Sequence, residues 1–178
     1  GGGGTKELYL KQLQGLPQGA NMNLLDVARK VFETVAMAKV STSAEEAREN
    51  GFLNDHDAIS VNNDHLIYDA KQKVLALDQA GFTPRKREKV PVVGEAGYAM
   101  LLLGAKQLQI GGYASEHDVK IAEKLAYVLS GGKLKEGTLV DEDYLLDLER
   151  EAFLSLIGEP KTQARMQHML LKGKPLRN

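Results

Sequence analysis

The sequence predicts an all-α fold of about eight helices with little or no sheet. Three observations support this fold class. Apolar residues recur at three- and four-residue spacing, as they do along one face of a helix. Capping residues precede these stretches and glycines follow them. Only Ala58–Val61 has the composition of a strand, and a strand without a partner is marginal.

The first expected helix covers residues 6–14, and Gly15 and Pro17 would end it. Thr5 would cap its N-terminus, because a threonine hydroxyl accepts a hydrogen bond from a free backbone amide. The next helix begins after Asn23, another good capping residue. Its apolar stripe consists of Leu24, Val27, Ala28, Val31 and Val35. This spacing predicts that one face of the helix is buried.

Two more helices are expected in the first half of the chain. Ser43 and Glu46 have the spacing of a capping box, in which the serine oxygen and the glutamate carboxylate each satisfy a backbone amide. That helix would end at Gly51. The following helix begins at Asn63 and reaches about Ala80, where a glycine comes next.

A helix over residues 95–110 follows a charged loop at residues 84–91. Its middle, Tyr98–Leu103, is apolar on every side, which predicts a central helix that is buried on most sides. Ser115 then opens another helix, with Asp118 three residues further along.

The last two helices are expected over residues 142–157, after Asp141, and from Pro160 to about Lys172. The apolar stripe of the first consists of Leu145, Leu148, Ala152 and Leu156. Proline is well tolerated in the first turn of a helix, so Pro160 suits the start of the second.

Composition limits the classes of protein that the chain can represent. It has 178 residues, 43% of them hydrophobic, which is enough for a core and too many for a disordered chain. The net charge of -1 argues against a general nucleic-acid binder. Without cysteine there is no disulfide or cysteine-ligated zinc, and a reducing compartment such as the cytoplasm is expected. No apolar run approaches the roughly 20 residues of a membrane span. Residues 1–178 are expected to form one helical domain.

The opening glycines do not form a nucleotide phosphate loop. That loop requires lysine before the hydroxyl residue, whereas here Thr5 precedes Lys6. A glycine turn before a helix N-terminus still favours an anionic or carbonyl-rich ligand, because free amides and the helix dipole meet there.

Other polar groups favour ordinary structural roles. His56 lies in the segment Asn54–Asp57, which is more typical of a turn than of a metal site. His117 falls in the first turn of a helix and is expected to be solvated. Glu149 and Glu151 flank Arg150, and since positions two apart do not face each other, a surface ion-pair network is expected.

Three segments of the chain resemble segments of a known enzyme family. Gly1–Glu7 resembles the glycine turn and helix start, Pro-Gly-x-Gly-Gly-Thr, in the middle of a crotonase (enoyl-CoA hydratase/isomerase) domain. Ala44–Leu53 resembles the alanine-rich helix that follows in that family. Glu149–Asn178 resembles the C-terminus of bacterial bifunctional 3-hydroxyacyl-CoA dehydrogenases, which carry the dehydrogenase first and a crotonase domain last.

The resemblance implies an enzyme of fatty-acid β-oxidation. Its dehydrogenase part would use NAD to oxidise 3-hydroxyacyl-CoA, and its crotonase part would hydrate trans-2-enoyl-CoA. In that family two backbone amides form an oxyanion hole, and two glutamates act as general base and acid.

In the family these glutamates and amides precede the glycine turn at which this chain begins. The chain is therefore expected to be the helical C-terminal part of a longer enzyme, with the dehydrogenase and the crotonase sheet core upstream. No residue of this chain is assigned a catalytic or metal-binding role, and the isolated chain is expected to be inactive and to hold no NAD. The residues expected to contact substrate are Gly1, Gly2, Gly3, Gly4, Thr5, Arg85, Lys86 and Arg87.

The expected partners are an acyl-CoA substrate in the longer enzyme and a second copy of the chain, without nucleic acid. Two alternatives stay open. The chain could be a non-catalytic interaction module that docks a partner through residues 98–103. It could also be a small acyl-CoA carrier that binds the CoA phosphates with Arg85–Lys89, although a charged loop is more often simply solvated.

Overall fold

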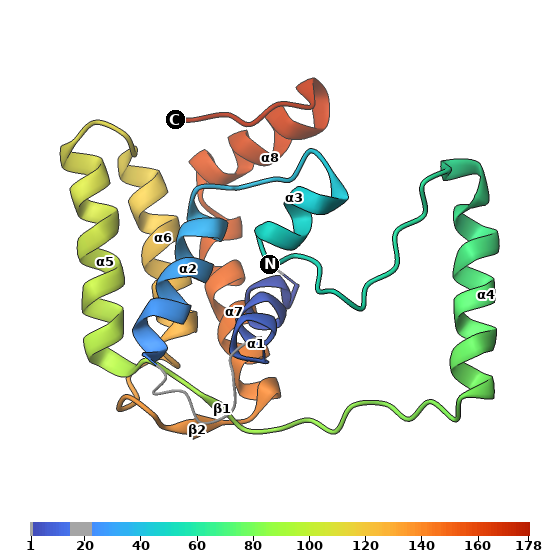
Figure 1. Ribbon diagram of the computed structural model, residues 1–178. Coiled ribbons are helices and arrows are strands. Elements are labelled where there is room, and N and C mark those ends of the chain that lie inside the picture. The colour runs from blue at the N-terminus through green and yellow to red at the C-terminus, as the bar shows by residue number, and fades with distance from the viewer. Residues whose placement is uncertain (1, 15–22) are drawn as a thin grey trace. The chain divides into compact units, whose positions relative to one another are not determined.

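The computed structural model describes residues 2–14 and 23–178 (Figure 1). Within these ranges it contains eight α-helices, a short 3-10 helix and one two-stranded sheet, which confirms the all-α prediction. The described chain divides into two compact units, unit 1 (Gly1–Val40 and Glu88–Asn178) and unit 2 (Ser41–Arg87). The single domain expected over residues 1–178 stays a prediction.

Unit 1 holds most of the secondary structure. Its elements are α1 (Gly4–Gln14), α2 (Leu24–Ala36), β1 (Val90–Pro91), α5 (Gly94–Ile110), α6 (Glu116–Leu129), β2 (Leu139–Val140), α7 (Glu142–Ile157) and α8 (Pro160–Lys172). Unit 2 contains α3 (Ala44–Glu49), the 3-10 helix Asn63–His65 and α4 (Leu66–Gln79). None of the helices in the described ranges combines the length and the apolar character that crossing a membrane requires.

Helix α6 lies at the centre of unit 1. It packs against α5, α7 and α2, and also contacts α1. Ala126 and Leu129 of α6 are buried together with Val31 of α2 and Leu145 of α7. The core of unit 1 is therefore organised around α6.

Helix α5 is not buried on most sides, so the prediction of its central position is wrong. Only one face is buried, through Gly97, Leu101 and Ala105, which recur every four residues. Met100 and Leu103 on other faces are 48% and 49% exposed. An apolar pattern on every side does not specify which faces find a neighbour, and here the face with small residues packs closely on α6.

The predicted caps of two helices are confirmed. The side chain of Asn23 accepts a hydrogen bond from the amide of Leu25 at 3.1 Å. Ser115 and Asp118 form a complete capping box at the start of α6. Gly15 and Pro17, which were expected to end the first helix, lie outside the described residues.

The capping box expected at α3 is half formed. The Ser43 hydroxyl accepts from the amide of Glu46 at 3.0 Å, as predicted. The Glu46 carboxylate reaches one residue further back and accepts from the amide and hydroxyl of Thr42, at 2.6 and 2.7 Å. These hydrogen bonds with Thr42 lower the pKa of Glu46.

Ala58–Val61, the only segment with a strand-like composition, has no strand structure. The two strands instead form outside all the expected helices. Val90 pairs with Val140 and Pro91 with Leu139, in antiparallel register. A short strand needs a partner more than it needs a strand-like composition, and the fold brings these two segments together.

Candidate functional site

The predicted glycine turn leads directly into α1. The structure describes Gly2, Gly3, Gly4 and Thr5, and Gly1 lies outside the described residues. Gly3 is buried at a φ of +98°, a conformation that favours glycine. Its carbonyl accepts the amide of Glu7 at 2.9 Å, so Gly3 takes the N-cap position. The prediction that Thr5 caps the helix is wrong, since Thr5 is buried within the first turn.

The carboxylate of Glu149, on α7, caps α1 instead. Its Oε2 accepts the amide of Gly3 at 2.9 Å, and its Oε1 accepts the amide of Lys6 at 2.6 Å. Glu149 is only 3% exposed. The free amides and the dipole at a helix N-terminus favour negative charge, so this buried carboxylate stabilises the turn and the helix start together.

A second buried carboxylate of α7 meets the side chain of Lys6. Glu142, which is 2% exposed, accepts the Lys6 ammonium at 3.0 Å, and the same ammonium contacts Glu7. Burial alone would lower the pKa of Lys6. The hydrogen bonds to Glu7 and Glu142 outweigh it and raise the pKa above its ordinary value. We call Lys6, Glu142 and Glu149 the Lys6 cluster.

The prediction that Glu149 belongs to a surface ion-pair network is therefore wrong. Arg150 pairs with Asp147 at 3.6 Å on the exposed side of α7. The sequence did contain a signal for the buried glutamates. Glu142 and Glu149 are seven residues apart and fall on the same helical face as the apolar stripe Leu145, Leu148 and Ala152. Carboxylates in register with an apolar stripe indicate buried groups that need partners.

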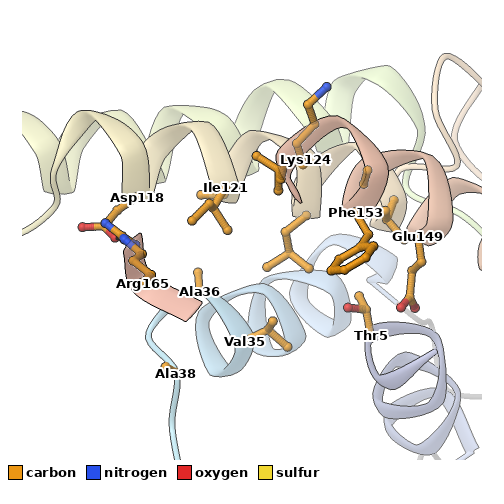
Figure 2. Close-up of a pocket in the computed structure, with 15 residues that line it drawn as sticks. Thr5, Val35, Ala36, Ala38, Asp118, Ile121, Lys124, Glu149, Phe153 and Arg165 are labelled. Atoms are coloured by element: carbon orange, nitrogen blue, oxygen red, sulfur yellow. The ribbon is translucent and has the colours of Figure 1, made fainter. Parts of the chain in front are cut away.

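An apolar cavity of about 290 Å³ lies beside the cluster, between α2, α6 and α7 (Figure 2). Thr5, Glu149 and Phe153 lie at one end of it, as Figure 2 shows. At the other end Arg165 donates to Asp118 at 2.7 Å. The apolar wall comprises Val35, Ala36, Ile121, Ala122, Leu125, Val128, Ala152 and Leu156. Most of the lining is apolar, so the geometry of the cavity favours apolar contact over chemistry.

His117 is buried, so the expected solvated position is wrong. Its Nε2 shares a hydrogen bond of 2.9 Å with the hydroxyl of Thr162 on α8. Burial, with the nearby cations of Arg165 and Lys161, holds the pKa of His117 below its ordinary value. The first turn of α6 is covered by α8, a contact that the local sequence does not reveal.

The turn predicted around His56 is confirmed. The Asn54 side chain accepts the amide of His56 at 3.0 Å, and the Asp57 carboxylate accepts the amide of Asn54 at 2.9 Å. Across residues 2–14 and 23–178, no three histidine, aspartate or glutamate side chains gather as a metal-binding group.

Arg85, Lys86 and Arg87 are exposed and lie outside any helix or strand, at the end of unit 2. The glycine turn and Thr5 belong to unit 1. The two groups of predicted substrate contacts are therefore in different units, and their shared role in binding an acyl-CoA stays a prediction.

The comparisons with known proteins give one clear similarity. Over its whole length of 178 residues the chain is 61% identical to a probable 3-hydroxyacyl-CoA dehydrogenase of Bacillus subtilis (strain 168). The match covers only 22% of that protein, so the chain spans about a fifth of its relative. No family model and no solved structure matches the chain. The chain is thus similar, throughout its length, to a segment of a probable 3-hydroxyacyl-CoA dehydrogenase.

Proposed function

We propose that this chain is a segment of a longer 3-hydroxyacyl-CoA dehydrogenase of fatty-acid β-oxidation, which also hydrates trans-2-enoyl-CoA. The observation that carries the proposal is the 61% identity, which extends over every part of the chain. An identity of this size over 178 residues supports a shared role for the segment in the two proteins.

The glycine turn supports the hydratase part of the proposal. Residues 2–4 form a turn that leads into α1, and the positive φ of Gly3 requires the glycine that the crotonase-like pattern places there. In this proposal Gly1–Gly4 and Thr5 position the acyl-CoA. The role of Arg85, Lys86 and Arg87 in substrate binding is a separate proposal, which rests on the match between guanidinium groups and phosphate geometry.

The dehydrogenase step requires NAD, which accepts a hydride from the 3-hydroxyacyl group. The described residues do not fit this cofactor. Their sheet consists of two antiparallel strands of two residues each, whereas a dinucleotide site is built on parallel strands with crossover helices. We therefore assign NAD to the remainder of the longer enzyme and derive no step through it here.

We further propose that this chain alone is inactive. Its buried carboxylates already have partners, since Glu142 meets an ammonium and both oxygens of Glu149 meet backbone amides. A general base needs a lone pair directed at the substrate. Neither glutamate has this geometry, which supports a positioning role for the segment.

The test compares this chain with the longer enzyme in two spectrophotometric assays, one for 3-hydroxyacyl-CoA oxidation with NAD and one for enoyl-CoA hydration. We expect both activities in the longer enzyme and neither in the chain. A longer enzyme that cannot oxidise 3-hydroxyacyl-CoA would refute the main proposal. Turnover by the chain well above background would refute its inactivity.

A second candidate function is that of a non-catalytic interaction module. Such a module would bind a partner, which could be a second copy of this chain. Helix α4 has no buried residue, and Leu66, Ile67, Val74 and Leu77 leave an apolar stripe exposed along it. Such exposed stripes often mark contact surfaces. Light scattering on the chain discriminates, because a module of this kind should associate unaided, and a monomeric mass would count against it.

A further inference from the structure

Helix α7 contacts the glycine turn through two side chains. Glu149 binds the amides of Gly3 and Lys6. A Cβ added to Gly3 would lie 3.0 Å from the Cδ2 atom of Leu146. Leu146 and Glu149 are three residues apart and therefore neighbours on the helix surface. One face of α7 thus holds the turn through a pair of hydrogen bonds and a close apolar contact.

The Glu149 carboxylate also occupies the place where an external anion would bind. An anion at a helix N-terminus is held by free amides and by the helix dipole. Here two of these amides are taken by a carboxylate that belongs to the chain and is almost fully buried. The turn is consequently fixed by the protein itself, because Glu149 accepts the amides of Gly3 and Lys6.

The other side of the turn remains accessible. Gly2 and Gly3 line an open hollow together with Leu146, Arg150 and Phe153 of α7. Glu149 thus holds the buried side of the turn, and the opposite side lines the open hollow beside α7. A small shift of the turn would alter the surface that it presents in this hollow.

We infer that Glu149 is a positioning residue, through which α7 sets the geometry of the glycine turn for enoyl-CoA hydration. The inference rests on the proposed function. Glu149 itself touches neither substrate nor reacting atoms, and acts through Gly3 and Lys6. Because both carboxylate oxygens are used, a side chain that offers fewer than two acceptors cannot hold the turn in the same way.

The test uses Glu149→Gln in the longer enzyme, with Glu142→Gln as the matched control. Glutamine keeps the size of the side chain but replaces one acceptor oxygen by a donor, which would face an amide N–H. Glu142 lies on the same helix, is buried to a similar extent and meets the Lys6 ammonium. Both variants therefore remove a buried carboxylate, but only Glu149→Gln alters the hydrogen bonds with the amides of Gly3 and Lys6.

The readouts are the kcat for enoyl-CoA hydration, the kcat for 3-hydroxyacyl-CoA oxidation, and the midpoint of urea unfolding. For Glu149→Gln we expect the hydration kcat to fall about 10- to 100-fold, the order expected for a misplaced site. The kcat for oxidation should be retained in Glu149→Gln. The Glu142→Gln control should keep its hydration kcat within about threefold of the wild-type value, although its loss of stability should be similar to that of Glu149→Gln.

Amide hydrogen exchange on this chain supplies a readout besides activity. Glu149→Gln should lose protection at the amides of Gly3 and Lys6, whereas Glu142→Gln should retain it. Equal protection, or equal hydration kcat, in the two variants would overturn the inference and leave the proposed function intact. Wild-type enzyme that oxidises 3-hydroxyacyl-CoA but does not hydrate enoyl-CoA would refute the hydratase proposal, and the inference with it.

Discussion

Gly94→Ala should destabilise unit 1 strongly, because Gly94, at the start of α5, packs closely against the backbone of the segment before β2. Gly94 has a φ of +66°, where an L side chain is strained. A Cβ at this position would lie 2.3 Å from the amide nitrogen of Glu136 and 2.6 Å from the carbonyl carbon of Lys135. Both of these atoms belong to the backbone, so the overlap cannot be relieved by rotating a side chain.

The expected magnitude combines two effects. A left-handed conformation costs an L residue about 1–2 kcal/mol. Inserting atoms into a tightly packed region costs about 1–3 kcal/mol more. The free energy of unfolding should therefore fall by about 2–5 kcal/mol, a large fraction of the roughly 5–15 kcal/mol that is typical of a domain.

The control is Gly112→Ala, just beyond the other end of α5. Gly112 has a φ of +76°, but no atom lies within 4 Å of a Cβ built there. Urea unfolding followed by circular dichroism should show a midpoint about 1–2.5 M lower for Gly94→Ala, and about 0.5–1 M lower for the control, at m near 2 kcal/mol/M. Equal shifts for the two variants would show that the close approach at Gly94 has no energetic consequence.

Three further predictions concern buried and capping groups. Lys6→Met should cost about 3 kcal/mol or more in urea unfolding, since it removes the ammonium from a buried ion pair with Glu142, and Lys6→Met combined with Glu142→Gln should recover part of this loss. Burial and the Arg165 and Lys161 cations hold the pKa of His117 below 6.5 in the folded state, so the unfolded chain binds more protons there. Stability should thus decrease as the pH falls below 6.5, and His117→Gln should flatten this dependence in unfolding titrations. Asn23→Ala should cost about 1 kcal/mol in thermal unfolding, and Asn23→Ser, which keeps an acceptor, should recover most of it.

Local signals predicted the helices well. The caps at Asn23 and Ser115 act within three residues, and the structure confirms both. Helices α5 and α7 begin and end close to the predicted residues, since glycines and capping positions mark their ends. These features depend on neighbouring backbone groups, which is why the sequence alone is sufficient for them.

Features that depend on distant contacts were predicted less well. Ala58–Val61 has the composition of a strand but does not form one, whereas Val90–Pro91 is a strand because Leu139–Val140 lies beside it. His117 was expected in solvent and is covered by α8. In each case the outcome was decided by a segment far away in the sequence, which no local pattern specifies.

The candidate site shows the same division. The sequence by itself determined that a glycine turn precedes α1, because only glycine adopts the conformation at Gly3 without strain. Only the tertiary structure decided what caps this turn. The capping carboxylate comes from Glu149, more than a hundred residues away, and Thr5 beside the turn is left inside the helix. Helix capping requires an acceptor near free amides, and any part of the folded chain that reaches them can provide it.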